Sequence, residues 1–248
     1  MHAWPQVSSA RVTRTLILVH GAWHGAWCWH KLTPLLESKG ARVIAPDLPS
    51  MGADATPASE VTLESWANFI ASCAPADTPC VLVGHSLGGA VISRVAELIP
   101  ERIRTLVYLS AYLLPAGATV AETARADAES LIAPNMIPVL RGVTCALRDE
   151  VVGDTFYGAC TREDREFAEE HIGPQPLKPL VTPLEVSAAR FGTVPRAYVE
   201  TTRDRAVSLS AQRRMQAKLP CAPVFTLDTD HSPFLSQPEA LARILISI

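Results

Sequence analysis

Residues 81–90 read VLVGHSLGGA, a run of strand-forming residues that ends in a serine set among three glycines. The segment fits the pattern G-x-S-x-G, with an apolar strand-like run before it and a helix-like segment after it. Glycines two residues before and two residues after the serine permit a sharp turn and a close approach of strand and helix. We therefore expect the hydroxyl of Ser86 to be exposed at the carboxyl end of a sheet. A tight turn that merely contains a serine is the alternative.

Similar apolar runs recur on both sides of this stretch, and they are continuous rather than alternating. Continuous runs are typical of parallel strands that are covered on both faces. Helix-like segments lie between several of the runs, which predicts an α/β protein with a doubly wound parallel sheet. The predicted strands are 16–19, 41–45, 80–83, 103–109, 196–201 and 223–227, and the main predicted helices are 29–38, 63–74, 87–98 and 209–219.

The segment 113–194 breaks this alternation. It is rich in proline, contains short helical fragments such as 162–171, and offers no convincing core strand. An insertion that leaves the sheet and returns to it at Arg196 is typical of a lid. We therefore predict a core made of residues 1–112 and 195–248, with residues 113–194 as a cap.

Composition excludes several classes of function. The 248 residues are 48% apolar, 19% charged and carry a formal net charge of -3, so no basic field is available for nucleic acid or an anionic membrane. Residues 1–5 lack the features of a signal peptide and no apolar stretch approaches a membrane span, so we expect a cytoplasmic protein. The six cysteines are scattered without metal-ligand or disulfide spacing, and we expect neither a zinc site nor a disulfide framework.

A serine nucleophile needs a base, and His231 is the best placed of the seven histidines. It follows the last predicted strand in DTDHSPF, residues 228–234, and a loop there reaches the same sheet edge as Ser86. His85 adjoins the serine, but adjacent side chains on a tight turn diverge, so we expect it to pack.

The acid that orients the base is predicted to be Asp204, in a loop just past the strand 196–201. Asp228 and Asp230 compete because they lie near His231 in sequence, but they are too close along the backbone to reach the far ring nitrogen easily. Two amides should hold an oxyanion: that of Leu87, directly after the serine, and that of Ala22, in the loop HGAWHGAW after the first strand.

Three segments carry a resemblance to a known family: LILVHGAWHGAWCWHKLTPLLESKG, VLVGHSLGGAVIS and LDTDHSPFLSQPEAL. With them, the chain resembles the α/β-hydrolase superfamily, and within it the branch of methylesterases, hydroxynitrile lyases and bacterial pyrethroid-hydrolase-like carboxylesterases. The resemblance implies an α/β-hydrolase fold, with a mostly parallel sheet and a helical cap inserted after the sixth strand. It also implies Ser86, His231 and Asp204 as a catalytic triad, Ala22 and Leu87 as oxyanion donors, no cofactor, and often a homodimer.

The function expected from these residues is carboxylic ester hydrolysis (EC 3.1.1.-) through an acyl-enzyme, on a small to medium hydrophobic ester. A hydroxynitrile lyase is one alternative, but that branch has threonine in place of Gly21 and lysine in place of Ser232. A weakly catalytic small-molecule receptor is another, and amides, thioesters or lactones are alternative substrates. The residues expected to line the substrate pocket are Trp23, Leu131, Met136, Phe156, Tyr157 and Phe191.

Overall fold

The computed structural model describes residues 14–248, so the prediction that concerns residues 1–5 lies outside the described part of the chain. A six-stranded sheet forms the centre of the molecule, with strand order β2-β1-β3-β4-β8-β9, and every neighbouring pair is parallel. This is the predicted doubly wound sheet. Its strands are β1 (Thr15–Val19), β2 (Arg42–Ile44), β3 (Cys80–His85), β4 (Ile103–Leu109), β8 (Arg196–Thr201) and β9 (Val224–Leu227).

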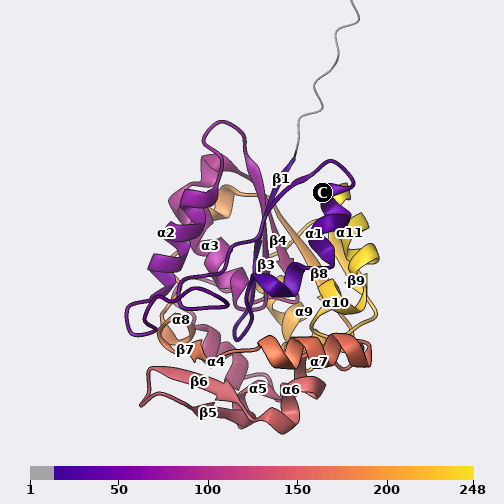
Figure 1. The fold of residues 1–248 in the computed structure, drawn as a ribbon. Coiled ribbons are helices and arrows are strands. Elements are labelled where there is room, and N and C mark those ends of the chain that lie inside the picture. Colours follow the sequence, from indigo (N-terminus) through magenta and orange to yellow (C-terminus); the bar gives the residue numbers. More distant parts are fainter. Residues whose placement is uncertain (1–13) are drawn as a thin grey trace, which may run out of the picture.

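Helices cover both faces of the sheet (Figure 1). α2 packs against α3 on one face, and α1 packs against α11 on the other. Residues of the central strands, such as Leu16, Ile17 and Leu82, have no exposed surface, which explains why their sequences are continuously apolar. The helices of this part are α1 (Leu32–Glu37), α2 (Leu63–Cys73), α3 (Gly88–Leu98), α9 (Leu209–Lys218), α10 (Pro233–Ser236) and α11 (Pro238–Ser247), with 3-10 turns η1 (Ala26–Trp29) and η2 (Pro100–Arg102).

The chain between β4 and β8 lies across one end of the sheet, at the bottom of Figure 1. It contains five short helices and a separate antiparallel sheet of order β5-β6-β7. We call residues 113–194 the insertion. Its elements are α4 (Val120–Arg125), α5 (Ile132–Asn135), β5 (Met136–Pro138), β6 (Thr144–Leu147), α6 (Asp149–Phe156), α7 (Arg162–His171), β7 (Gln175–Pro176), α8 (Lys178–Val181) and the 3-10 turn η3 (Phe191–Thr193).

Two details of the predicted insertion differ from the structure. It follows β4, the fourth strand of the described sheet, and not a sixth strand, because only four sheet strands precede it within residues 14–248. It is also not purely helical. β5, β6 and β7 escape sequence analysis because they are two to four residues long and two of them include prolines, Pro138 and Pro176.

Candidate active site

Ser86 occupies the turn between β3 and α3 with a backbone φ of +53°. The turn is possible because the residues around it are small: a Cβ built on Gly84 would lie 2.5 Å from the carbonyl oxygen of Gly88. The peptide groups of Ser86 are fixed on both sides, since its N–H donates to Leu109 (3.2 Å) and its carbonyl accepts from Gly89 (3.0 Å). A residue held in this sparsely populated conformation by its surroundings is typical of a functional site.

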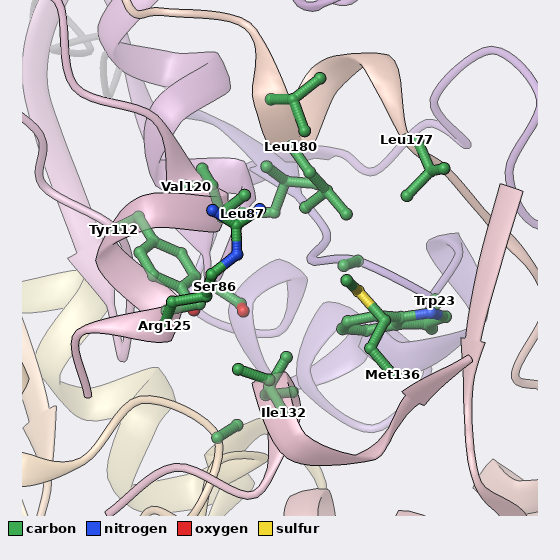
Figure 2. Close-up of a pocket in the computed structure, with 16 residues that line it drawn as sticks. Trp23, Ser86, Leu87, Tyr112, Val120, Arg125, Ile132, Met136, Leu177 and Leu180 are labelled. Carbon is green, nitrogen blue, oxygen red and sulfur yellow. The ribbon is translucent and has the colours of Figure 1, made fainter. Parts of the chain in front are cut away.

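A cavity of about 210 Å³ opens beside Ser86 (Figure 2). It lies between the carboxyl ends of the sheet strands and the insertion, because residues that follow β1, β3, β4 and β8 line it together with residues of the insertion. Most of its walls are aliphatic or aromatic. The lining residues are Ala22, Trp23, Ser86, Leu87, Tyr112, Val120, Ala121, Ala124, Arg125, Ile132, Ala133, Met136, Leu177, Leu180, Val181 and Ala206.

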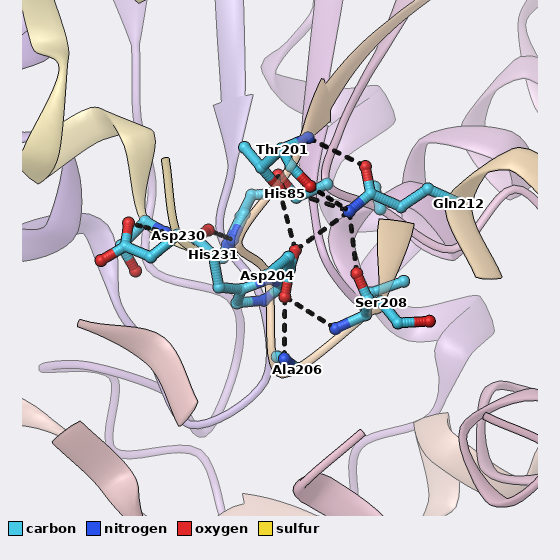
Figure 3. Close-up of polar contacts among 12 residues, drawn as sticks. His85, Thr201, Asp204, Ala206, Ser208, Gln212, Asp230 and His231 are labelled. Atoms are coloured by element: carbon cyan, nitrogen blue, oxygen red, sulfur yellow. Dashed lines mark hydrogen bonds and ion pairs between the residues drawn. The ribbon is translucent and has the colours of Figure 1, made fainter. Parts of the chain in front are cut away.

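The structure brings His231 and Asp204 together from two different loops (Figure 3). His231 Nδ1 lies 2.8 Å from Asp204 Oδ2, and both side chains are fully buried. A carboxylate can only accept a hydrogen bond, so neutral His231 carries its proton on Nδ1. Its other nitrogen, Nε2, is buried and has no hydrogen-bond partner within residues 14–248. The imidazole is therefore oriented with one free acceptor nitrogen.

Asp204 is itself held by a dense set of donors. Its Oδ1 accepts from the N–H groups of Ala206 and Val207, both at 2.8 Å. Its Oδ2 accepts from Thr201 Oγ1 (3.0 Å) and Gln212 Nε2 (3.2 Å), in addition to His231. These bonds fix the carboxylate and satisfy it without a cation, which is how a buried charge becomes tolerable.

The two competing aspartates have other roles in the fold. Asp228 is exposed and bonds to Thr202 and Arg203. Asp230 is buried, and it accepts from the N–H groups of Ala159 (2.7 Å) and Ser232 (3.1 Å). Asp230 thus ties the loop of His231 to the insertion, and neither residue bonds to the His231 ring.

His85 does more than pack. Its Nε2 donates to the carbonyl oxygen of His231 (2.9 Å), and the two rings lie 4.4 Å apart between centroids. The residue that directly precedes Ser86 thus contacts both the backbone and the ring of His231. Sequence analysis missed this link because it joins residues 146 positions apart.

The loop after β1 approaches Ser86 closely. A Cβ on Gly21 would lie 2.7 Å from Ser86 Cβ and 2.9 Å from His85 Nδ1, so glycine is required there for this packing. Ala22 and Leu87 line the cavity with Ser86. No hydrogen bond among residues 14–248 uses the N–H of either residue, so both are free to donate to a ligand.

The backbone of Trp23 has a φ of +63° and is attached to the insertion. Its N–H donates to Gln175 Oε1 (3.2 Å), its carbonyl accepts from Gly173 (2.9 Å), and its indole Nε1 donates to Cys145 (3.2 Å). Three hydrogen bonds, to Cys145 of β6, to Gln175 of β7 and to Gly173 two residues before β7, therefore hold the loop next to Ala22.

Three histidines around this site are buried and neutral. Burial lowers the pKa of His20, lowers that of His24 to about 3, and lowers that of His85 well below its usual value. His24 donates from Nδ1 to the carbonyl of Ala22 (2.8 Å) and accepts at Nε2 from the hydroxyl of Tyr157 (2.9 Å). That pairing fixes the tautomer of the ring.

Of the six residues predicted to line the pocket, Trp23 and Met136 lie on the cavity wall, whereas Leu131, Phe156, Tyr157 and Phe191 do not. Phe156 and Tyr157 pack behind it, where their rings contact that of His24. Leu131 precedes the lining residue Ile132. The guanidinium of Arg196 lies over the ring of Phe191, and its Cζ is 4.9 Å from the centroid of that ring. Sequence analysis could not place them, because the fragments of the insertion show no periodicity from which a buried face can be derived.

Of the other lining residues, Ala22, Ser86 and Leu87 were predicted as site residues, whereas the rest, including Tyr112 and Arg125, were not predicted from the sequence. Within residues 14–248 the structure contains no cluster of three histidine, cysteine or acidic residues that could hold a metal ion. None of the helices in that range has the length and apolarity needed to cross a membrane. All six cysteines are free.

Comparison with known proteins places these features in a family. Residues 16–244 match the Alpha/beta hydrolase family. The pyrethroid hydrolase of Sphingobium wenxiniae is 33% identical over 240 residues, which are 93% of this chain and 85% of that protein. "Putative methylesterase 11, chloroplastic" of Arabidopsis thaliana is 30% identical over 249 residues, but this chain spans only 64% of its length.

A solved structure of tomato methylketone synthase I with 2-tridecanone superposes with a TM-score of 0.84 and 26% identity, covering 95% of this chain and 97% of that one. The two structures thus match over nearly the whole length of both chains. The family match spans both ends of the described sheet, the serine turn and the histidine loop. The chain belongs to the alpha/beta hydrolase family.

Proposed function

We propose that the protein is a carboxylic ester hydrolase with Ser86 as the nucleophile, His231 as the general base and Asp204 as the residue that orients the base. The observation that carries this proposal is the bond from His231 Nδ1 to Asp204 Oδ2, which leaves Nε2 as the free ring nitrogen. The methylesterase and pyrethroid hydrolase relatives support an ester as the substrate.

In the first half of the reaction, His231 Nε2 takes the proton of Ser86 as Oγ attacks the ester carbonyl carbon. The carbonyl electrons move onto oxygen, where the amides of Ala22 and Leu87 stabilise the charge. Collapse of this intermediate breaks the bond to the alcohol oxygen, which leaves with the proton from His231. The acyl group remains on Ser86.

In the second half, water replaces the alcohol. His231 removes a proton from water as its oxygen attacks the acyl-enzyme, and the same two amides hold the second oxyanion. Collapse breaks the bond to Ser86 Oγ, which recovers its proton from His231, and the acid is released. The insertion covers this chemistry as a cap, and its apolar walls favour an ester with a hydrophobic part.

Hydrolysis of p-nitrophenyl esters of increasing acyl length by wild type and Ser86→Ala tests this proposal. We expect turnover to fall by about 10⁴-fold or more in the variant, because the nucleophile is removed. A phosphonate inhibitor should add to wild type, and peptide mass spectrometry should find it on Ser86. Equal turnover by both proteins would contradict the role of Ser86. Release of cyanide from a cyanohydrin, without ester hydrolysis, would instead identify a lyase.

A further inference from the structure

The wall of the cavity next to Ser86 carries one charged residue, Arg125, which is the last residue of α4. Arg125 is exposed, and its guanidinium forms no hydrogen bond or ion pair with any group in residues 14–248. Of the other lining residues, Ser86 and Tyr112 carry hydroxyl groups, and the indole N–H of Trp23 already donates to Cys145. The rest are apolar. Arg125 is therefore a cation beside a mostly apolar cavity, and no contact within residues 14–248 neutralises its charge.

The acidic residues near Arg125 in sequence are occupied elsewhere. Glu122 accepts from Thr119 Oγ1 (2.9 Å). Asp127 accepts from the N–H and hydroxyl of Ser208 (2.9 and 2.7 Å) and lies 3.7 Å from Arg214. Glu129 accepts from the hydroxyl of Ser210. The charge of Arg125 is therefore available to a ligand in the cavity.

Tyr112 supplies a second polar group on the same wall. Tyr112 is 5% exposed, and its hydroxyl has no hydrogen-bond partner among residues 14–248. Its backbone is fixed, since its N–H donates to the carbonyl of Ser86 (3.0 Å). Burial, together with the charges of Asp204 and Asp127, raises the pKa of the Tyr112 hydroxyl, so it stays protonated and can donate.

Figure 2 shows how these groups divide the cavity. Tyr112 and Arg125 are drawn on the same side as Ser86, whereas Trp23, Met136 and Leu177 are drawn on the opposite side. The guanidinium and the hydroxyl thus lie on the side of the cavity that holds the serine, together with the apolar side chains of Leu87 and Val120, and the opposite side offers apolar surface. An ester with a charged part and an apolar part matches both sides.

We propose that Arg125 and Tyr112 bind a carboxylate carried by the substrate, so that the protein prefers monoesters that bear a free carboxylate to neutral esters of the same size. This inference rests on the proposed ester hydrolysis at Ser86. The guanidinium donates charge-assisted hydrogen bonds to the carboxylate and the tyrosine hydroxyl adds one more. The apolar alcohol or acyl group then lies against Trp23 and Met136.

Two matched pairs of esters test the preference and show which side of the ester carries the carboxylate. Monobenzyl succinate and benzyl pentanoate differ in the acid part. 4-(Butanoyloxymethyl)benzoate and benzyl butanoate differ in the alcohol part. We expect wild type to show a higher kcat/KM for the charged member of at least one pair. The ratio within that pair should fall about tenfold in Arg125→Gln, fall less in Tyr112→Phe, and recover in Arg125→Lys.

Arg148→Gln is the matched control, because Arg148 is also exposed, lies in the insertion and does not line the cavity. Its ratios should equal those of wild type. No preference for the charged ester in either pair, or an unchanged ratio in Arg125→Gln, would overturn the proposal.

Binding to Ser86→Ala separates this proposal from the hydrolysis proposal. Calorimetry should show tighter binding of the charged member of at least one pair, and adding Arg125→Gln should remove the difference. If that difference is present but wild type hydrolyses neither these four esters nor the p-nitrophenyl esters, the hydrolysis proposal fails and the carboxylate site stands. If the difference is absent, the carboxylate site is wrong even where hydrolysis is observed.

Discussion

At the scale of single residues, the carboxylate of Asp204 determines which nitrogen of His231 carries the proton. In Asp204→Asn the side-chain amide can donate an N–H to Nδ1 of His231. The ring then carries its own proton on Nε2, and that nitrogen can no longer accept a proton as a base. We expect kcat to fall at least about 100-fold. Thermal stability should fall as well, because the amide nitrogen of Asn cannot accept the hydrogen bonds that Thr201 and Gln212 donate to the carboxylate. Steady-state kinetics against p-nitrophenyl butyrate checks the loss of kcat, with the exposed Asp228→Asn as control. Equal losses in the two variants would contradict the assignment of Asp204.

Gly21 is a second residue at which a small change should have a large effect. In Gly21→Ala the new methyl would meet Ser86 Cβ and His85 Nδ1, so Ser86, the proposed nucleophile, must shift. A displacement of the reacting atom by about 1 Å can cost about 100-fold in rate, and we expect a loss of that order in kcat/KM. Gly173→Ala is the control, because a Cβ there meets nothing within 4 Å. Wild-type activity in Gly21→Ala would show that the packing at this position is loose.

The residues around Ser86 differ in how far sequence analysis could find them. The turn at Ser86 has a local pattern, and Asp204 and His231 follow strands whose carboxyl ends share one edge, so their proximity could be predicted. Tyr112 and Arg125 have no such signal, because Tyr112 lies in the irregular segment after β4 and the place of Arg125 depends on how α4 packs. The catalytic roles of the three residues stay predictions until the variants are measured.

At the scale of elements, the contact between the end of β3 and the loop after β9 depends on His85. His85 donates to the carbonyl of His231, and no other hydrogen bond within residues 14–248 reaches that oxygen. His85→Phe should leave it buried without a donor, at a cost of about 1–3 kcal/mol in the free energy of unfolding, and should lower kcat by displacing the base. Urea unfolding and steady-state kinetics measure the two effects.

His85→Gln distinguishes positioning from packing. Its side-chain amide can donate to the same carbonyl, so we expect kcat in this variant to recover much of what the phenylalanine variant loses. Equal kcat values in His85→Phe and wild type would show that His231 is held by other contacts.

The elements of the sheet could be predicted more completely than those of the insertion. Each long strand is a continuous apolar run, because it is covered on both faces, and the observed bounds of β4 and β8 are the predicted ones. The insertion is made of short helices and strands that are stabilised by contacts with one another and with the loop after β1. Such contacts leave no periodic pattern in the sequence, so β5, β6 and β7 were not predicted, and four of the six residues expected on the cavity wall lie elsewhere.

At the scale of the whole molecule, three buried neutral histidines make stability depend on pH. Burial lowers the pKa of His20, His24 and His85 in the folded state, while an unfolded chain protonates histidine near pH 6.5. Below pH 6.5 the unfolded state therefore binds more protons than the folded state. Stability is greatest above that pH and falls as the pH decreases towards the lowered values, about 3 for His24.

Urea titrations at pH 7.5, 6.5, 5.5 and 5.0 measure this dependence. We expect the free energy of unfolding to fall below pH 6 by roughly 1 kcal/mol per pH unit for each of the three histidines. His24→Gln should show a shallower decline than wild type, since one of the three groups is removed. Equal stability at pH 7.5 and 5.0 would contradict the buried neutral state of these rings.

The hydrogen bonds of His24 and Trp23 have a consequence for exchanging parts between relatives. His24 connects the carbonyl of Ala22 to Tyr157, and the peptide groups of Trp23 bond to Gly173 and Gln175. A chimera that receives another protein's insertion without these partners would lose the anchors of the loop beside Ser86. The insertion that lines the substrate cavity and the loop that holds the proposed oxyanion donor therefore depend on each other. A graft between relatives has to transfer the loop after β1 together with the insertion.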